Sequence, residues 1–451
     1  MRRPAQTASA EDAPHGPPAP DGEDTPSGPP GPDGEDTRSG PPAPDGEDTP
    51  LGPPGPDGED TPSGPPAPDG EDTRSGPPGP DGEDTPSGPP GPDAEDAPQE
   101  APAPDDETRP AGGSRKRTWP RALRRTALAL VLLLLLPILA AETALRVNYT
   151  GTPEPGTYTR NRDAIWLGHA WIDGRKTDAD VTALAGRLGG TGIRDVYVHA
   201  GPLEHDGTLP KSAYPRARWL IETLHGKAPH IRVQAWLGDE VAPEKPYAMH
   251  LERPATRSHV VASTRQILDA GFQGAHFDLE PLHSGDRNYL ALLDALHRVT
   301  RDHHAVLSVA AHQIDPLPAL HSFWGTATGH PKWWSQAYFG QVARRVDQIA
   351  VMSYDTMQPS QSLYGGYVAQ QTSLALEVTP ESTDLLMGLP FYHENRFGHW
   401  ARAETVPAAV RGVRLGLSRT DKSRARFGVA LYVDFAATEA DWTAYREDWV
   451  R

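Results

Sequence analysis

The sequence predicts an α/β protein in which a (β/α)8 TIM barrel is preceded by a disordered repeat tail and one membrane-anchor or signal helix. Three observations carry this prediction. Residues 1–114 are an acidic Pro/Gly-rich segment with 12-residue repeats, residues 115–145 combine a basic flank with an apolar run, and residues 160–451 alternate short apolar runs with helical patterns. A chain of 451 residues has room for one large domain with such appendages.

The barrel is predicted by eight short apolar runs separated by segments of helical periodicity. Apolar strands that alternate with helices indicate a parallel sheet, and eight such strands close a (β/α)8 barrel, which typically takes ~250 residues. The predicted strands are Ala164–Ala170, Asp195–His199, Arg232–Leu237, Gly274–Leu279, Ala305–Ala310, Gln348–Ser353, Leu385–Leu389 and Val429–Val433. The predicted helices include Asp178–Leu188, with Thr177 or Asp178 as its N-cap, Ser258–Ala270, Arg287–Arg301, Ser335–Val346 and Val406–Leu415.

The tail contains a repeat of 12 residues between positions 16 and 99. It follows the pattern Gly-Pro-Pro-(Ala/Gly)-Pro-Asp-Gly-Glu-Asp-Thr-(Pro/Arg)-Ser through seven copies. Thr or Ala begins some of its triplets, which a collagen triple helix does not tolerate, because only Gly fits at its axis. An acidic, Pro-rich segment with little apolar surface to bury is expected to be extended and disordered. It could bind a partner, but a passive spacer explains its composition equally well.

A basic flank and an apolar run follow the tail. The flank contains Arg115-Lys-Arg, and the run covers Thr126–Ala141. Basic residues before an apolar run place its amino-terminal side in the cytoplasm. The 16-residue run is short for a spanning helix of roughly 20 residues and could equally be the core of a signal peptide. The long tail favours an anchor, so we expect a single-pass protein of the cell membrane with an extracytoplasmic catalytic domain, or a secreted one if the segment is cleaved.

Composition excludes several classes of function. The chain has no Cys, so it has no disulfide framework, thiolate metal site or Cys nucleophile. The net charge of −18 lies mostly in the first 150 residues, since residues 151–451 carry 33 acidic and 31 basic side chains. The near-neutral barrel without a basic stripe argues against nucleic-acid binding. We expect a monomer that needs no cofactor, and we expect no metal site because His303, His304 and His312 have no acidic partner at ligand spacing.

The fourth predicted strand carries the residues that most need an explanation. Strand side chains alternate between two faces, so Asp278 and Glu280 share one face and Ala275, Phe277 and Leu279 share the other. Two acids in an apolar strand cost free energy unless they are paired or used. In (β/α)8 barrels the chemistry lies at the carboxyl ends of the strands, which is where this pair is expected.

Other predicted strand ends contribute aromatic and acidic groups to the same mouth. The sixth ends in Tyr354-Asp355 and the seventh in Phe391-Tyr392, while the first carries Trp166, His169 and Trp171 and the third carries Trp236. Carboxylates can act on acetal oxygens, and flat aromatic faces stack on sugar rings. The mouth therefore suits a carbohydrate substrate, whose hydrolysis needs a protonated carboxylic acid at the leaving oxygen.

These motifs resemble glycoside hydrolase family 18, the chitinase-like barrels. That family's fourth-strand pattern Asp-Gly-x-Asp-x-Asp-x-Glu is similar to Gln273-Gly-Ala-His276-Phe-Asp278-Leu-Glu280. Its sixth-strand pattern Met-x-Tyr-Asp is met at Met352–Asp355, and its seventh-strand pattern Gly-(Leu/Ile)-Pro-Phe-Tyr is met at Gly388–Tyr392. The resemblance covers roughly residues 160–450, in barrel order.

The resemblance implies a substrate-assisted retaining glycosidase acting on β-linked N-acetylhexosamine polymers, such as chitin-type or peptidoglycan glycans. Glu280 would be the general acid and later the base, and the substrate's 2-acetamido oxygen would be the nucleophile. Asp278 would hold the acetamido N–H, Tyr354 would donate its hydroxyl to the acetamido carbonyl, and Asp355 would contact the same sugar. The expected sugar-contacting residues are Trp166, His169, Trp236, His276, Tyr392 and Tyr432.

The chain also departs from the family pattern. Gln273 and His276 replace the first two acids, and Tyr432 stands near the place of the tryptophan that usually forms the floor of the sugar site. His276 could be protonated and pair with Asp278, or it could be a hydrogen-bonded core histidine. Two alternatives stay open: a catalytically inactive barrel that binds glycans, and a retaining glycosidase with another carboxylate pair, Glu280 and Asp355.

Overall fold

The structure is a computed structural model, and it describes residues 121–322, 332–396 and 398–451. The predicted disordered tail and the Arg115-Lys-Arg flank lie outside the described residues. All the described residues belong to one compact unit.

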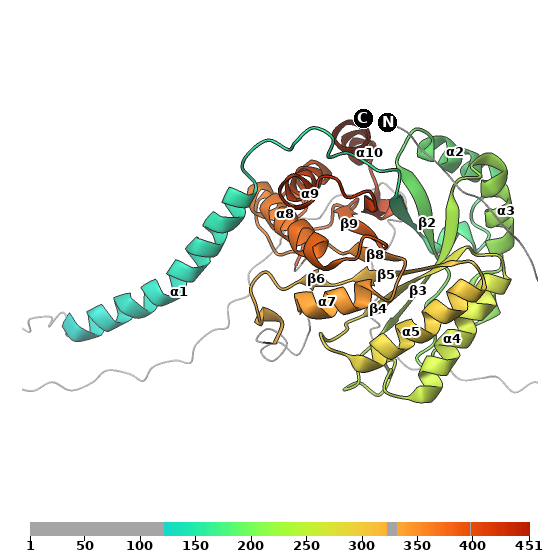
Figure 1. Cartoon of the computed structure of the whole chain (residues 1–451), viewed down its shortest axis with the longest axis horizontal. Coiled ribbons are helices and arrows are strands. Elements are labelled where there is room, and N and C mark those ends of the chain that lie inside the picture. The colour runs from blue at the N-terminus through green and yellow to red at the C-terminus, as the bar shows by residue number, and fades with distance from the viewer. Residues whose placement is uncertain (1–120, 323–331, 397) are drawn as a thin grey trace, which may run out of the picture. The chain divides into compact units, whose positions relative to one another are not determined.

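Within the described residues, eight parallel strands close into a barrel in the spatial order β1-β10-β9-β8-β5-β4-β3-β2 (Figure 1). The (β/α)8 prediction is therefore confirmed. The barrel strands are β1 (Asp163–Leu167), β2 (Ile193–His199), β3 (Arg232–Glu240), β4 (Gly274–Glu280), β5 (Val306–Ala311), β8 (Gln348–Val351), β9 (Asp384–Pro390) and β10 (Phe427–Tyr432). The short strands β6 (Gln313–Ile314) and β7 (Trp333–Trp334) pair with each other after β5.

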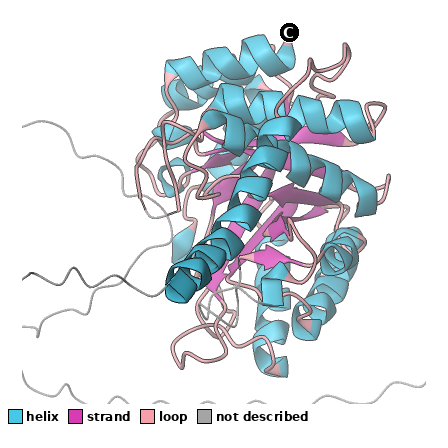
Figure 2. Ribbon diagram, turned by 90° about the vertical axis from the view of Figure 1, so that its left-hand side faces the viewer, coloured by secondary structure: helices cyan, strands magenta, loops and turns pink. Residues whose placement is uncertain are grey.

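Helices surround the strands on the outside of the barrel (Figure 2). They are α2 (Asp178–Leu188), α3 (Ala217–Lys227), α4 (Pro254–Asp269), α5 (Arg287–Asp302), α7 (Gln336–Ala343), α8 (Gln361–Val378), α9 (Val406–Thr420) and α10 (Glu439–Tyr445). Short 3-10 turns lie at His169–Trp171, Lys211–Ala213 and Asp434–Ala436, and a π-helical turn lies at Arg446–Val450. Thr177 caps α2 in a capping box with Asp180, as the sequence predicted for this helix start.

Three predicted strand ends are wrong. The first strand ends at Leu167 rather than Ala170, and His169–Trp171 forms a 3-10 turn. The sixth ends at Val351, two residues before Ser353. The third continues past Leu237 to Glu240, because strand pairing with β4 extends into the polar Gly238–Glu240. Apolar composition therefore does not fix where a strand ends.

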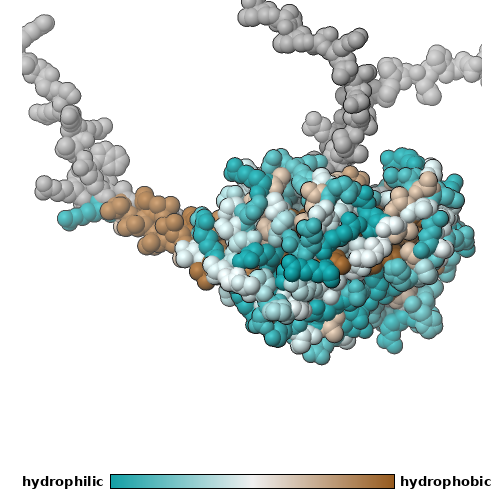
Figure 3. All heavy atoms as spheres, turned by 90° about the horizontal axis from the view of Figure 1, so that it is seen from above, coloured by the Kyte–Doolittle hydropathy of each residue, from teal (hydrophilic) through white to brown (hydrophobic). Residues whose placement is uncertain are grey.

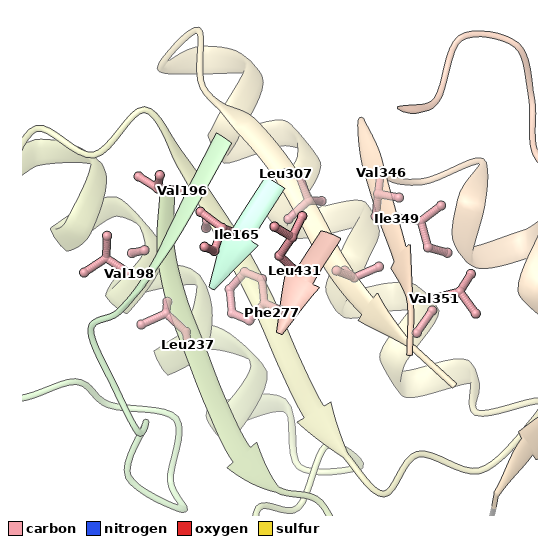
Figure 4. Packing of buried hydrophobic residues seen from close by; sticks show 14 of the residues in the cluster. Ile165, Val196, Val198, Leu237, Phe277, Leu307, Val346, Ile349, Val351 and Leu431 are labelled. Carbon is pink, nitrogen blue, oxygen red and sulfur yellow. The ribbon is translucent and has the colours of Figure 1, made fainter. Parts of the chain in front are cut away.

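The barrel wall separates an apolar outer layer from a more polar interior. Ala275, Phe277 and Leu279 lie in the outer layer between strands and helices, together with the residues labelled in Figure 4. The inner face of β4 carries His276, Asp278 and Glu280, so the predicted alternation holds. This arrangement leaves the interior free for polar side chains that reach the mouth.

Asp163 closes the seam between the first and last barrel strands. It is fully buried, and its Oδ2 accepts hydrogen bonds from the Thr159 hydroxyl (2.8 Å), the Tyr445 hydroxyl (2.8 Å) and the Trp449 indole (2.9 Å). Its Oδ1 accepts the backbone N–H of Val429 in β10 at 2.9 Å. Burial, partly offset by these hydrogen bonds, raises the pKa of Asp163. The carboxyl-terminal turn thereby holds the seam shut.

The apolar run before the barrel forms helix α1 (Arg121–Asn148). Its segment Leu128–Asn148 has 21 residues and is long and apolar enough to cross a membrane, although a signal sequence would pass the same test (Figure 3). The helix is longer than the apolar run of 16 residues, because it continues past Ala141 into a more polar turn.

Candidate active site

The carboxyl ends of β3, β4, β8, β9 and β10 bring most of the predicted site residues to one mouth of the barrel. The strand register pairs Gly238 with Asp278 and Glu240 with Glu280, so β3 follows β4 to its end. The predicted residues fall into two groups. Trp166, His276, Tyr354 and Tyr392 are buried, whereas His169, Trp236, Asp278, Glu280, Asp355 and Tyr432 keep part of their surface exposed.

Glu280 has a strongly perturbed acidity. Burial first, and then the negative charges of Asp278 and Asp355, raise its pKa. The side chain still exposes 40% of its surface, so solvent weakens the effect of burial and the two neighbouring carboxylates gain in relative weight. A carboxyl group held protonated at a barrel mouth has the acidity that a general acid needs near neutral pH.

Asp278 is held by one hydrogen bond and leaves one oxygen unused. The indole of Trp236 donates to Oδ2 at 3.1 Å, while Oδ1 is buried and has no hydrogen-bond partner among the described residues. Burial, partly offset by the Trp236 bond, raises the pKa of Asp278. A buried acceptor without a donor costs free energy, and a ligand that brings an N–H or O–H donor would relieve this cost.

His276 does not pair with Asp278 through a proton. The Trp166 indole, which can only donate, donates to His276 Nε2 at 3.1 Å, so Nε2 carries no proton. Nδ1 contacts the Ser308 hydroxyl, and the ring stacks on Tyr197 at 3.8 Å. Burial lowers the pKa of His276 to about 3. Of the two readings left open by the sequence, these contacts favour a neutral, hydrogen-bonded core histidine.

Gln273 lies at the opposite end of β4 from Glu280. Its Oε1 accepts the backbone N–H of Val233 at 2.8 Å and contacts His225 Nε2 at 3.0 Å. Gln273 therefore ties β4 to β3 and α3, and its replacement of a family acid does not change the groups at the mouth.

Aromatic rings form one wall of the mouth. Tyr432 stacks on Tyr354 at 5.2 Å and meets the edges of Trp236, Tyr392 and Trp166 at 6.2, 5.8 and 5.5 Å. Trp166 is 1% exposed and lies beneath this wall, with its N–H already used by His276. Trp236 and Tyr432 are half-buried, so they offer ring surface to a ligand that Trp166 does not.

Asp355 is surrounded by donors and cations. The Tyr392 hydroxyl donates to Oδ1 at 2.7 Å, Arg396 donates to Oδ2 at 2.9 Å, and His399 Nδ1 lies 3.2 Å from Oδ1. Burial opposes the charged carboxylate, but His399, Tyr392 and Arg396 outweigh it and hold the pKa of Asp355 below its ordinary value. The pKa of Glu280 is thus raised, which favours its protonated form, whereas the pKa of Asp355 is lowered, which favours its carboxylate form.

Glu404 fixes the backbone on which Asp355 stands. Its two carboxylate oxygens accept the N–H groups of Asp355 (2.7 Å) and Thr356 (2.8 Å), and Asp355 has a left-handed φ of 54°. His399 is fully buried, with Nδ1 3.2 Å from both Asp355 and Glu404, although neither contact is well aligned as a hydrogen bond. Burial disfavours its charge, but the two carboxylates outweigh burial and raise the pKa of His399 to about 9.

Asp355, His399 and Glu404 are close enough together to hold a metal ion. The donor set does not suit one. Both Asp355 oxygens and both Glu404 oxygens already accept hydrogen bonds, and the cations Arg396 and Lys332 lie against Asp355, with Lys332 Nζ 2.8 Å from its carbonyl oxygen. A protonated His399 supplies the positive charge that the two carboxylates need.

His399, Glu404, Arg396 and Ser308 support the site without belonging to any motif recognised in the sequence. Ser308 lies directly across from His276 in the β4–β5 register, so strand pairing could have indicated it. The other three lie in the segment between β9 and α9, which carries no periodic pattern. His169, at the β1 side of the mouth, donates from Nδ1 to the His199 carbonyl oxygen at 3.1 Å.

Comparison with solved structures finds distant likenesses to chitinase-type barrels. The spore cortex-lytic enzyme SleL of Bacillus megaterium QM B1551 is 12% identical over 64% of this chain and 74% of its own, with a TM-score of 0.45. A class V chitinase from Pseudomonas fluorescens Pf-5 is 13% identical over 63% and 98%, with a TM-score of 0.43. A chitinase from Chromobacterium violaceum ATCC 12472 is 14% identical over 63% and 98%, with a TM-score of 0.45. No family model and no curated protein matches the sequence. At these identities and TM-scores the likenesses assign no activity to the chain.

Proposed function

We propose that this barrel is a glycoside hydrolase of the family-18 type that cleaves β-linked N-acetylhexosamine glycans. The observation that carries the proposal is the acid pair on β4, where the pKa of Glu280 is raised and the buried Asp278 Oδ1 has no donor among the described residues. A protonated Glu280 can give its proton to the leaving oxygen, and the free acceptor beside it suits the N–H of a 2-acetamido group.

In the proposed reaction, Glu280 gives its proton to the glycosidic oxygen as the bond from the anomeric carbon to that oxygen breaks. The acetamido oxygen of the same sugar forms a bond to the anomeric carbon and gives an oxazolinium ion. Glu280, now a carboxylate, takes a proton from the water that opens this ion, which restores both the sugar configuration and the acid. Both proton transfers use Glu280 on β4, and the nucleophile comes from the substrate itself.

Two unused polar atoms support acetamido participation. Asp278 Oδ1 is a buried acceptor without a donor, and it suits the acetamido N–H. The Tyr354 hydroxyl makes no hydrogen bond within residues 121–322, 332–396 and 398–451, and it suits the acetamido carbonyl oxygen. Trp236 and Tyr432 would contact the apolar face of the sugar.

A catalytically inactive glycan-binding barrel is the second candidate. The observation that favours it is the neutral His276, whose two nitrogens contact Trp166 and Ser308, so that position 276 offers Asp278 no acid with which to share a proton. A third reading, in which Glu280 and Asp355 act as an ordinary carboxylate pair, predicts activity on sugars without an acetamido group.

We also propose that α1 anchors the barrel at the outer side of a membrane. The apolar length of Leu128–Asn148 and the basic flank before it support this orientation. Protease treatment of intact cells tests it, since an extracytoplasmic barrel is digested and a cytoplasmic one is protected.

Turnover assays separate these candidates. Wild type, Glu280→Gln, Asp278→Asn and the control Glu222→Gln, an exposed residue on α3, are assayed on N-acetylglucosamine oligosaccharides and peptidoglycan. The proposal expects loss of turnover in the first two variants, full turnover in the control, and inhibition by a thiazoline mimic of the oxazolinium ion. Turnover that survives Glu280→Gln refutes it. Glycan binding without turnover in the wild type indicates the inactive barrel, and insensitivity to the thiazoline indicates the third reading.

A further inference from the structure

A second hollow lies at the end of the barrel opposite the mouth. It has a volume of about 390 Å³ and is lined by five arginines, four near the amino-terminal ends of strands (Arg162, Arg194, Arg232 and Arg426) and one, Arg301, in the last turn of α5. His304, Asp347 and Asp384 complete most of its wall. It shares no residue with the proposed catalytic site.

The carboxylates around this hollow are too few for its arginines. Asp384 is shared by Arg194 at 2.7 Å, Arg162 at 3.0 Å and Arg426 at 3.6 Å. A single carboxylate offers two oxygens, so three guanidinium groups on it retain N–H groups without an acceptor in the ion pair.

The deeper carboxylate is also shared. Asp195 is fully buried and binds Arg232 through two bonds of 2.7 and 2.8 Å, with Arg194 at 3.3 Å. Asp347 accepts the backbone N–H of Leu307 at 2.9 Å. The five arginines carry five positive charges and the three aspartates carry three negative charges, so two positive charges are in excess if His304 is neutral.

Two side chains at the rim have no partner of their own. Among the described residues, the Arg301 side chain makes no ion pair or hydrogen bond, and neither does the His304 side chain. Four of the five arginines are half-buried, so solvent screens their mutual repulsion less than on an open surface.

We propose that this hollow binds a small dianion of the phosphate type. A group with two negative charges matches the excess charge, and its several acceptor oxygens match converging guanidinium groups. Asp384 and Asp195 bind these guanidinium groups, and Asp347 lies beside them. The three carboxylates would repel a long polyanion more than a single small group, because more of its length would lie against them. The free phosphate ion and a phosphate monoester share this chemistry.

Calorimetric titration of the full chain in detergent tests the site with inorganic phosphate, at constant ionic strength against chloride. The proposal expects saturable binding by the wild type, with Arg301→Gln and Arg426→Gln each weakening it by about tenfold or more, as expected for a hydrogen bond to a charged group. Arg298→Gln, an exposed arginine on the same helix as Arg301, is the matched control and should bind as the wild type does.

Three results would overturn the proposal: no heat beyond that of chloride, equal weakening by Arg298→Gln and Arg301→Gln, or unchanged binding in Arg301→Gln. Because the Arg301 side chain is exposed and makes no hydrogen bond or ion pair among the described residues, its variant should remain folded. Glu280→Gln should bind phosphate normally, so the result is independent of the proposed activity. A last experiment measures binding of the protein to vesicles with and without phosphatidylglycerol. Binding to the anionic vesicles without binding to free phosphate would show that the hollow recognises a lipid surface rather than a small dianion.

Discussion

Replacing Asp278 by asparagine removes one negative charge beside Glu280 while it keeps the shape of the side chain. The two residues are separated by one position on β4, so their carboxylates lie roughly 6.5 Å apart. Two unit charges at that distance interact by about 2.6 kcal/mol at an effective dielectric constant of about 20, and by about 1.3 kcal/mol at about 40. The 40% exposure of the Glu280 side chain argues for the lower figure, which corresponds to about one pKa unit.

We therefore expect the pKa of Glu280 to fall by about one unit in Asp278→Asn. In the wild type Asp278 loses its proton first, and its charge then holds the Glu280 proton to higher pH. A general acid must be protonated, so the alkaline limb of kcat/KM for the residual activity should move to lower pH. Titration of the glutamate carboxyl carbons by NMR measures the same shift where activity is too low.

The matched control is Asp302→Asn, an exposed aspartate at the end of α5 that should leave the alkaline limb in place. An alkaline limb that stays unchanged in Asp278→Asn, or that moves to higher pH, would refute the assignment of Glu280 as the acid held by its neighbours.

Four further predictions concern the mouth and the residues beneath it. The fold raises the pKa of Glu280, so the stability that Glu280 contributes is present below its unfolded pKa and is lost as pH rises through its folded pKa. Glu280→Gln should therefore raise Tm relative to wild type more at about pH 8 than at about pH 5. Glu404→Gln should lower kcat more than it raises KM, with a stability loss of about 1–3 kcal/mol in urea unfolding, because the backbone N–H of Asp355 loses a charged acceptor. Tyr354→Phe should reduce kcat with little change in Tm, since the Tyr354 hydroxyl has no partner in the described fold. His276→Ala should lower the free energy of unfolding by about 2–4 kcal/mol, because it leaves a cavity and two unpaired polar groups.

The eight strands were predictable because each is a continuous apolar run, and the acid pair was predictable because strand alternation fixes which side chains share a face. The alternation of side chains along a strand does not determine how far below the mouth of the barrel an inward side chain lies. Trp166 and His276 do point into the barrel, as the sequence indicated, but they lie below the mouth and contact each other rather than open space. Whether an inward side chain reaches a ligand depends on the tilt of its strand, which the sequence pattern does not contain.

The charged supports of Asp355 could not be predicted for a different reason. His399 and Glu404 lie 44 and 49 residues beyond Asp355, in a segment without periodicity, and they meet it only because β8 and β9 are neighbours. A similar limit applies to α8, whose weak amphipathic pattern hides a helix with buried residues on several faces. Both features depend on the closed barrel rather than on any local stretch.

The buried seam at Asp163 also determines when the chain can reach its final form. Two of its donors, Tyr445 and Trp449, lie in the last turns of the chain, and a third comes from β10. Until those residues are in place, β1 begins with a carboxylate that lacks these three donors and has no neighbouring strand on one side. The barrel can therefore close at this seam only after β10 and the turns that follow it have formed, so its first strand depends on its last elements.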